Sequence, residues 1–385
     1  MKNEVFMPHR SKLALLINIV SPYRLPIYIK LGKVFQTRVI ISGQEDNSPH
    51  WKGLKETLIR NGVSVKILKG KGFRYKNLTE DGKTFENRNF NINPGYIHEL
   101  IKEKPDVIIS SEMGVRTVMA LLYGFIFRKP VWVWWGGTLH TERNRNYFKR
   151  WFRRGIAQFA RHWISYGETS TEYLVNIGVK PENILQIQNC VDETLYNKPI
   201  EPAYLDRPKP VLLFAGRFVM LKGLDFFLKA AARLQKEGYR FSTLLVGDGP
   251  EKESMQQLAK DLELESIHFA PPQSPEVMPA VYRSADAFVF PTLNDVWGLV
   301  INESLWSGVP VLSSIYAGCT PEIVPPENRF DPLDPRDFDR ALKLALDKKI
   351  KPADTTSLLT SDKVASMIVE DIQKYIGAED ENTAM

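Results

Sequence analysis

Residues 285–311 read Ala285-Asp-Ala-Phe-Val-Phe-Pro-Thr-Leu-Asn-Asp-Val-Trp-Gly-Leu-Val-Ile-Asn-Glu-Ser-Leu-Trp-Ser-Gly-Val-Pro-Val311. The apolar run at 287–290 predicts a buried strand, and the residues from about 297 to 306 predict a helix that follows a polar turn. Two acids lie eight residues apart, Asp295 in the turn and Glu303 in the helix. The turn joins the carboxyl end of a strand to a helix, so we expect both acids at the edge where α/β folds bind ligands.

The same turn predicts an anion-binding site. The amides of Trp297, Gly298 and Leu299 open the helix, where unpaired N–H groups and the helix dipole attract negative charge. An acid on either side of such a helix start suits a diphosphate flanked by two hydroxyl-rich sugars, and this describes a nucleotide-sugar. For either acid alone an alternative stays open, with Asp295 as a helix cap and Glu303 as an exposed helix residue.

A second strand–loop–helix pattern begins at Val211 and reads Val-Leu-Leu-Phe-Ala-Gly-Arg-Phe-Val-Met-Leu-Lys-Gly-Leu-Asp-Phe-Phe-Leu. The predicted strand ends at Gly216, Arg217 follows in the loop, and Lys222 precedes the next helix. A guanidinium and an ammonium at one sheet edge can hold a diphosphate and stabilise charge on a departing nucleotide. The local alternative is a pair of solvated surface cations.

Together the two segments resemble the retaining family 4 glycosyltransferases, which have the two-domain GT-B fold. Asp295 and Glu303 match the acid-x7-Glu signature of that family, with Asp in place of the usual first Glu. The Gly-Arg…Lys-Gly pattern that begins at Gly216 matches its phosphate-binding motif. The resemblance covers about residues 13–376 and is looser in the first half.

The resemblance implies a role for each matching residue. Arg217 and Lys222 would hold the donor phosphates, Glu303 would bind the nucleotide ribose, and Asp295 would bond the donor-sugar hydroxyls. The glycine turn at Gly247 would lie beside the nucleotide. The resemblance also implies front-face attack, in which the leaving phosphate takes the proton of the acceptor. No metal and no further cofactor is expected.

Candidates in the first half follow predicted strands as well. The segment Trp132-Val-Trp-Trp-Gly-Gly-Thr-Leu-His-Thr-Glu142 contains Gly137, which lets backbone approach a ligand, and then Thr138 and His140. His140 is a candidate catalytic residue, four positions after the usual family histidine; the alternative is a loop histidine without contacts. Glu112 follows the preceding strand and is a candidate acceptor contact. Arg24, in a Pro-Tyr-Arg turn similar to one in part of the family, is either a cleft residue or a surface residue.

Alternation of short apolar runs with helical patterns predicts two parallel sheets covered on both faces. The proline-rich residues 199–210 predict a linker between an acceptor-side domain, 1–198, and a nucleotide-sugar-binding domain, 211–360. By the resemblance, a helix at 361–376 crosses back to the first domain. Residues 377–385 are expected to form a disordered tail.

Composition supports a globular protein, with 43% hydrophobic and 25% charged residues and a net charge of +6. No signal peptide, membrane span or paired-cysteine pattern is expected, so we predict a cytoplasmic protein. Seven Lys or Arg interleave with aromatic residues at 143–163. This stretch predicts a basic helix that either contacts an anionic membrane surface, on the inner face of the membrane, or simply covers the sheet.

The sequence therefore predicts a retaining hexosyltransferase that uses a UDP- or GDP-sugar. The acceptor would be a hydroxyl of a glycan or a lipid-linked molecule, in the assembly of surface polysaccharide or glycolipid. A nucleotide-sugar epimerase or a phosphorylase of the same architecture is the second enzyme class. A basic nucleic-acid-binding protein is the non-enzymatic alternative, although nucleic acid is not an expected partner because it would leave Arg217, Lys222, Asp295 and Glu303 unexplained.

Overall fold

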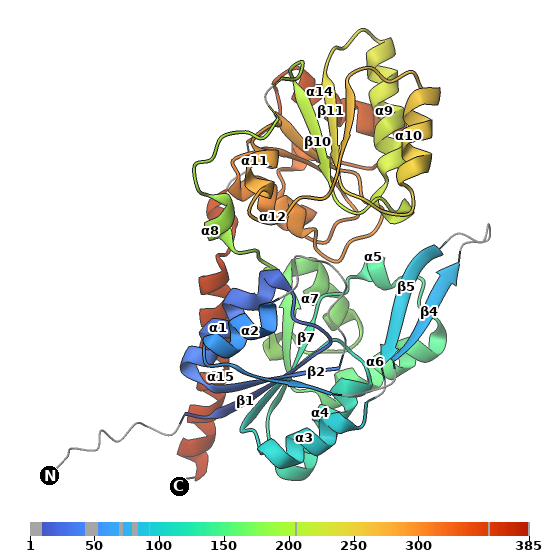
Figure 1. Cartoon of the computed structure of the whole chain (residues 1–385). Coiled ribbons are helices and arrows are strands. Elements are labelled where there is room, and N and C mark those ends of the chain that lie inside the picture. Colours follow the sequence, from blue (N-terminus) through green and yellow to red (C-terminus); the bar gives the residue numbers. More distant parts are fainter. Residues whose placement is uncertain are drawn as a thin grey trace, which may run out of the picture.

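The computed structural model describes residues 10–42, 53–68, 72–78, 84–91, 93–204, 206–352 and 355–383. They form two domains, each built on a parallel sheet, one above the other in Figure 1. The first sheet has the strand order β3-β2-β1-β6-β7-β8-β9, and the second has the order β12-β11-β10-β13-β14-β15. The predicted architecture of two Rossmann-like domains is confirmed.

The first domain contains seven parallel strands, a two-stranded antiparallel ribbon and eight helices among the described residues. The strands are β1 Lys12–Ile17, β2 Gln36–Ile41, β3 Ser64–Ile67, β6 Val107–Ser111, β7 Val131–Trp135, β8 His162–Tyr166 and β9 Ile184–Ile187, with the ribbon β4 Gly72–Leu78 and β5 Thr84–Asn91. The helices are α1 Leu25–Val34, α2 Leu54–Arg60, α3 Gly95–Glu103, α4 Val115–Phe127, α5 Leu139–Glu142, α6 Tyr147–Phe159, α7 Gly167–Asn176 and α8 Glu193–Tyr196. All five residues of β7 are buried, as expected for a strand covered on both faces.

The second domain has a smaller sheet with helices on both sides. Its strands are β10 Val211–Ala215, β11 Ser242–Val246, β12 Ile267–Ala270, β13 Ala287–Phe290, β14 Val311–Ser314 and β15 Arg329–Phe330. Its helices are α9 Leu224–Lys236, α10 Lys252–Asp261, α11 Met278–Tyr282, α12 Leu299–Trp306, α13 Thr320–Ile323 and α14 Pro335–Leu346. Helix α12 begins two residues later than the sequence predicts, because Gly298 has a left-handed φ of 103°.

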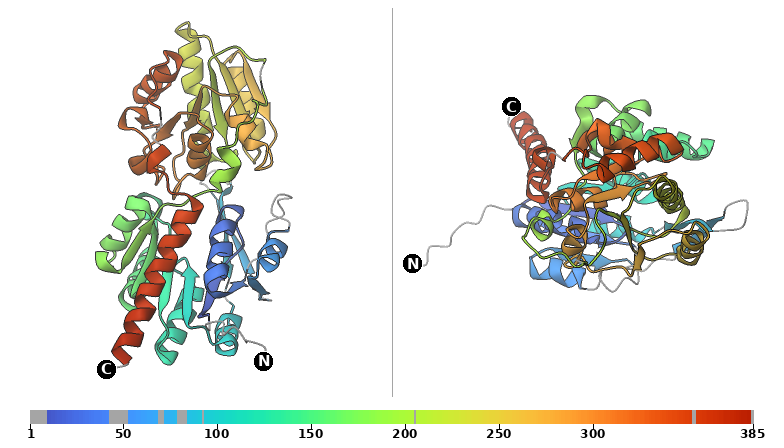
Figure 2. Two further views of the ribbon diagram at one scale, coloured as in Figure 1. Left: turned by 90° about the vertical axis from the view of Figure 1, so that its left-hand side faces the viewer. Right: turned by 90° about the horizontal axis from the view of Figure 1, so that it is seen from above.

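The last helix, α15 Ser361–Thr383, runs back along the first domain beside α1 (Figure 2). The indole Nε1 of Trp132 on β7 donates to Asp371 of this helix at 2.7 Å, and Lys30 on α1 pairs with Asp362 at 2.6 Å. The predicted crossing is therefore confirmed. The helix continues through residues 377–383, which the sequence assigned to a disordered tail, because extending a helix that is already packed costs little.

The basic stretch of the first domain forms a shorter helix than predicted. Asn146 caps α6, and its side chain accepts a hydrogen bond from the amide of Lys149 at 3.0 Å. The helix ends at Phe159 because Ala160 is extended and β8 starts at His162. Within the described residues, no helix has the length and apolar character that crossing a bilayer requires.

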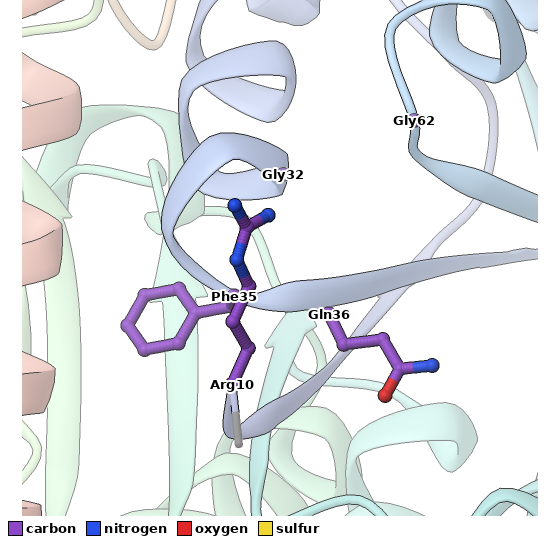
Figure 3. Close-up of a pocket in the computed structure, with 5 residues that line it drawn as sticks. All are labelled: Arg10, Gly32, Phe35, Gln36 and Gly62. Carbon is purple, nitrogen blue, oxygen red and sulfur yellow. The ribbon is translucent and has the colours of Figure 1, made fainter. Parts of the chain in front are cut away.

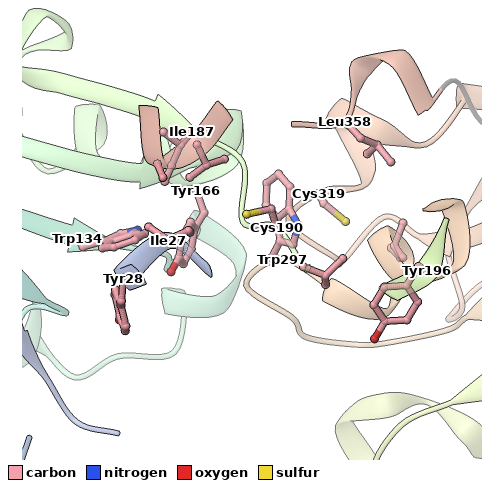
Figure 4. Close-up of a cluster of buried hydrophobic side chains, with 14 of the residues drawn as sticks. Ile27, Tyr28, Trp134, Tyr166, Ile187, Cys190, Tyr196, Trp297, Cys319 and Leu358 are labelled. Carbon is pink, nitrogen blue, oxygen red and sulfur yellow. The ribbon is translucent and has the colours of Figure 1, made fainter. Parts of the chain in front are cut away.

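The hydrophobic core continues from one domain into the other (Figure 4). Trp297 of the second domain is 1% exposed, and a Cβ atom added at Gly167 of the first domain would lie 2.5 Å from its ring. Cys190 and Cys319 are buried in the same cluster as free thiols. The two sheet edges therefore face each other across a partly filled junction, and this junction positions the site.

Candidate functional site

Lys222 and Asp295 form an ion pair at the carboxyl edge of the second sheet. The Lys222 Nζ lies 2.5 Å from Oδ2 of Asp295, and Oδ1 of the same carboxylate accepts the Trp297 amide at 3.1 Å. Both side chains are about one-fifth exposed. The two sequence motifs thus meet at one point, 73 residues apart in the chain.

Two glycines shape this edge through contacts within the chain. Gly223 has a φ of 63°, and a Cβ atom there would lie 2.1 Å from the carbonyl oxygen of Pro291. A Cβ atom at Gly247 would lie 1.9 Å from the carbonyl oxygen of Gly216, so the loops after β10 and β11 are in direct contact. Close backbone packing therefore accounts for Gly247. Arg217, next to Gly216, is exposed at the same edge.

Glu303 lies inside α12, and tyrosine hydroxyls hold its carboxylate. The hydroxyl of Tyr282 donates to Oε2 at 2.8 Å, and the hydroxyl of Tyr196 also bonds the carboxylate. Burial raises the pKa of Glu303 to about 7, against the opposing effect of the two hydrogen bonds. A carboxyl group with a pKa near 7 is typical of a functional site. Neither tyrosine was predicted, because no spacing or motif links them to α12.

The side chain of Glu303 borders a cavity of about 820 Å³ between the domains. The first domain contributes Pro22, Tyr23 and residues of α1 to its wall. The segment around α8 contributes Tyr196, and the second domain contributes Leu299 beside Glu303. A ligand in this cavity would therefore touch both domains and the start of α12.

His140 crosses from the first domain to the second. Its Nε2 lies 2.9 Å from the carbonyl oxygen of Leu293, two residues before Asp295, and its ring stacks on Tyr316 with centroids 4.6 Å apart. Burial lowers the pKa of His140, and its hydrogen bond to Leu293 opposes that effect. The structure thus brings His140 to the loop that carries Asp295. The alternative of a histidine without contacts is wrong.

Thr138 and Gly137, close to His140 in the chain, make their contacts within the first domain. Thr138 is buried and caps α5 through a reciprocal pair of hydrogen bonds with Thr141. A Cβ atom at Gly137 would lie 2.5 Å from the ring of Trp135, so this glycine is required by the chain itself. Packing against Trp135 thus explains this glycine, and the approach of a ligand to Gly137 stays a prediction. Glu112 is exposed in a left-handed turn with a φ of 67°.

Arg24 turns into the first domain. Its guanidinium donates to the Tyr166 hydroxyl and lies 4.8 Å from the centroid of the Trp134 ring. Its neighbour Tyr23 lines the cavity beside Glu303. Of the two residues in the predicted Pro-Tyr-Arg turn, Tyr23 thus faces the cleft, whereas the contacts of Arg24 lie within its own domain.

The helix start at Trp297, Gly298 and Leu299 differs from the prediction in one respect. The Trp297 amide is bonded to Asp295, and its buried indole donates to Asn302 at 2.8 Å. The amides of Gly298 and Leu299 have no acceptor in the described part of the chain. Two of the three predicted amides therefore remain for an anion.

Glu322 was not among the predicted site residues. Its carboxylate accepts the Glu168 amide at 3.1 Å and the side-chain amide of Gln188 at 2.9 Å, both from the first domain. Burial raises the pKa of Glu322. This residue therefore ties the second sheet edge to the first domain, close to the site.

A second hollow, of about 290 Å³, lies at the opposite edge of the first sheet (Figure 3). Arg10, Gly32, Phe35, Gln36 and Gly62 line it, at the amino end of β2. It contains none of the predicted site residues. Among the described residues, no group of three His, Cys, Asp or Glu side chains could hold a metal ion.

The sequence of the chain is similar to those of known glycosyltransferases. Residues 200–357 match the family model described as glycosyl transferases group 1. The D-inositol 3-phosphate glycosyltransferase of Nocardia farcinica is 37% identical over 119 residues, which are 29% of this chain and 26% of the relative. The sulfoquinovosyl transferase of Arabidopsis thaliana is 25% identical over 276 residues, 66% of this chain and 52% of the relative. The chain thus matches between about a quarter and about half of these relatives' length.

A solved structure extends the comparison to the whole fold. Anabaena HepE in complex with UDP and glucose aligns with a TM-score of 0.65 and 15% identity, over 97% of this chain and 100% of that chain. At this level of identity the likeness shows the fold. Both chains have the GT-B arrangement of two parallel-sheet domains.

Proposed function

We propose that this chain, whose residues 200–357 match the glycosyl transferases group 1 model, transfers a sugar from a nucleoside diphosphate-sugar to a hydroxyl group. One observation supports the proposal most: Asp295 and Glu303 lie on one strand–helix unit that faces the first domain, and Lys222, from the loop after the neighbouring strand β10, pairs with Asp295. Cations for a diphosphate and acids for hydroxyl groups are what such a donor requires.

Lys222 and Arg217 would hold the diphosphate. Lys222 is already paired with Asp295, so a phosphate oxygen would share or take over its ammonium. The amides of Gly298 and Leu299 would add hydrogen bonds to the same phosphates. As the bond to the sugar breaks, negative charge grows on the leaving diphosphate, and these donors would stabilise it without a metal ion.

Glu303 would accept hydrogen bonds from the ribose hydroxyls, held in place by Tyr282 and Tyr196. Asp295, released in part from Lys222, would bond hydroxyls of the donor sugar. The reaction would keep the anomeric configuration by front-face attack, with the proton of the acceptor passing to the leaving phosphate. The presence of UDP in the HepE complex supports a UDP-sugar, and a GDP-sugar is the alternative donor.

The acceptor would enter from the first domain. His140 lies beside the Asp295 loop, Tyr23 lines the cavity, and Glu112 and Arg24 follow neighbouring strands. We propose a glycan or lipid-linked acceptor in surface polysaccharide or glycolipid assembly, with the chain on the inner face of the membrane. An epimerase or a phosphorylase with this fold is the second candidate, and it would turn over a nucleotide-sugar or use phosphate without an acceptor hydroxyl.

The test is a thermal-shift screen of the purified chain with UDP, GDP, ADP, CMP and dTDP, first without metal. A ligand that binds only the folded state raises the melting temperature. We expect UDP or GDP to do so, and its sugar conjugates then to support transfer only when an acceptor is present. Turnover without acceptor would favour the epimerase. Absence of any nucleotide response, with tight and salt-dependent DNA or RNA binding, would contradict the proposal.

A further inference from the structure

Helix α4 exposes a stripe of large apolar side chains. Val118, Leu122, Phe125 and Ile126 follow the spacing of one helical face, and Phe125 is 85% exposed. The opposite face of the helix, with Tyr123 and its buried neighbours, already packs against the sheet. Core packing therefore does not account for the outer stripe.

Helix α6 has the same two-sided character. Phe152 and Ile156 pack inward, as a covering helix requires. On its outer side, Phe148, Trp151 and Phe159 are exposed, with Trp151 at 64% and Phe159 at 78%. The aromatic stripe predicted from the sequence is thus split between a buried face and an exposed face.

The two helices lie next to each other on the first domain. They contact each other directly, and Leu121 of α4 and Phe152 of α6 pack against the same buried cluster around Trp135 and Trp163. The two helices therefore lie on the same side of the first domain, and Figure 1 shows them next to each other. We call the exposed apolar side chains of both helices, together with the exposed Arg128, Arg150, Arg154 and Arg161, the α4–α6 surface.

The charge of the chain is concentrated in the segment that forms this surface. Residues 113–166 contain ten Lys and Arg and one acid, Glu142, a net charge of +9. The whole chain carries +6, so the other residues together carry −3. Glu142 is buried and pairs with Arg145 and Arg153, which removes two of the cations from the surface. The exposed arginines that belong to the α4–α6 surface are Arg128, Arg150, Arg154 and Arg161.

We propose that the α4–α6 surface binds an anionic lipid bilayer, with both helices lying in the plane of the interface. Exposed aromatic rings between cations match the apolar and anionic layers of a headgroup region. A protein partner would have to compensate the same cations with a matching acidic face, whereas an anionic bilayer does so without any specific fit. Membrane contact at α6 was expected from the sequence; the participation of α4 is new.

Two hydrogen bonds connect the α4–α6 surface to the cleft between the domains. Arg143 follows α5 and donates to the carbonyl oxygen of His140 at 2.6 Å, and Arg150 of α6 donates to the carbonyl oxygen of Arg143 at 2.5 Å. Arg143 thus links the N-terminal end of α6 to His140, which contacts the second domain. A bound bilayer would bring a lipid-linked acceptor toward the cleft. This last step rests on the proposed function, but the surface itself does not.

The test is cosedimentation of the full chain with vesicles of phosphatidylcholine alone or mixed with phosphatidylglycerol. We expect binding to the mixed vesicles only, and weaker binding at high salt. The charge variant Arg150→Gln, Arg154→Gln, Arg161→Gln should lose about tenfold or more of its partition coefficient. The apolar variant Phe125→Ser with Phe159→Ser should lose a similar factor, about tenfold, because it removes two exposed rings.

The matched control removes the same charge from exposed residues of the second domain, by Lys236→Gln, Arg240→Gln and Lys260→Gln. It should bind vesicles as the wild type does. An equal loss of vesicle binding in the control would overturn the proposal. Unchanged binding of the variant Phe125→Ser with Phe159→Ser would overturn it as well. A wild-type dimer that Phe125→Ser dissociates, without vesicle binding, would assign the surface to a second copy and also overturn the proposal. The thermal shift with nucleoside diphosphates should stay at its wild-type value in all variants, so failure of the two proposals can be distinguished.

Discussion

Asp295 and Glu303 belong to one strand–helix unit, yet their carboxylates have different partners. Asp295 pairs with the Lys222 ammonium and accepts a backbone amide, so its negative charge is compensated. Glu303 is held by the hydroxyls of Tyr282 and Tyr196, and burial raises its pKa to about 7. Asp295 is thus part of an ion pair at the sheet edge. Glu303 lies beside the interdomain cavity and changes its protonation state near pH 7.

This difference favours separate roles for Asp295 and Glu303 in binding a donor. At Asp295 the phosphate of a donor would compete for the Lys222 ammonium, so the pair would exchange partners on binding. At Glu303 the carboxylate keeps acceptor capacity for hydroxyl groups, because the tyrosines use only part of it. The predictions below test this contrast.

The largest effect is expected from Glu303→Ala. The variant should lose about a thousandfold in kcat/KM, about 4 kcal/mol, because the ribose contact is lost. Steady-state transfer assays would measure it, with Glu253→Ala, an exposed acid on α10, as the matched control. Wild-type activity in a folded Glu303→Ala protein would remove Glu303 from the site.

Lys222→Ala should weaken nucleoside diphosphate binding by about thirtyfold, about 2 kcal/mol, because a charged hydrogen-bond donor to phosphate is lost. Part of that loss would come from Asp295, left unpaired beside the diphosphate. Calorimetry of Lys222→Ala alone and combined with Asp295→Asn would separate the two contributions. An equal affinity of wild type and Lys222→Ala would contradict the diphosphate site.

The pH dependence distinguishes the two acids. The Glu303 pKa is raised from 4.5 to about 7, so the unfolded chain loses this proton at a lower pH than the folded chain does. Its contribution to stability is therefore complete below about pH 4.5 and is lost as the pH rises through about 7, by at most about 3 kcal/mol. Glu303→Gln should remove this loss and raise the melting temperature at pH 8, as differential scanning calorimetry at several pH values would measure.

The affinity for a nucleoside diphosphate should rise with pH, whereas the stability of the fold falls. The ionised carboxylate is the better acceptor for ribose hydroxyls, so affinity should increase about tenfold from about pH 6 to pH 8. Glu303→Gln should flatten the profile relative to Asp295→Asn. A wild-type profile without an inflection near pH 7 would show that Glu303 does not control binding.

The smallest effect is expected from Thr138→Ala, away from both acids. Thr138 caps α5 and has its partner within the first domain, so the variant should lose about 1 kcal/mol of unfolding free energy. Its kcat/KM should stay close to the wild-type value. A large loss of activity at unchanged stability would instead make Thr138 a substrate contact.

The second domain could be predicted closely because its strands are continuous apolar runs and its motifs lie at strand ends. β13 has the predicted bounds, β10 ends one residue before the predicted Gly216, and Lys222 and Asp295 meet at the predicted edge. The first-domain strands could be predicted for the same reason, apart from the ribbon β4–β5. In that ribbon β5 is mostly polar and β4 alternates apolar and polar residues only from Phe73 to Lys76, so the pattern on which strand prediction depends is weak.

Contacts between distant segments that carry no recognised motif could not be predicted. His140 meets Leu293 across 153 positions, and Tyr282 meets Glu303 although no motif joins them. The pairing of Arg153 with buried Glu142 also depends on how α6 folds back onto α5. Such contacts are set by the packing of whole elements, and the pattern within one segment carries no information about them.

Hydrogen exchange with and without saturating UDP or GDP tests the central claim most directly. The claim is that the carboxyl edge of the second sheet binds the nucleoside diphosphate. It predicts protection of backbone amides at residues 216–223 and 295–303, including the two open amides at the start of α12, with the control regions α10 and α14 unchanged. Protection confined to the first domain, or to the hollow around Phe35, would contradict the claim.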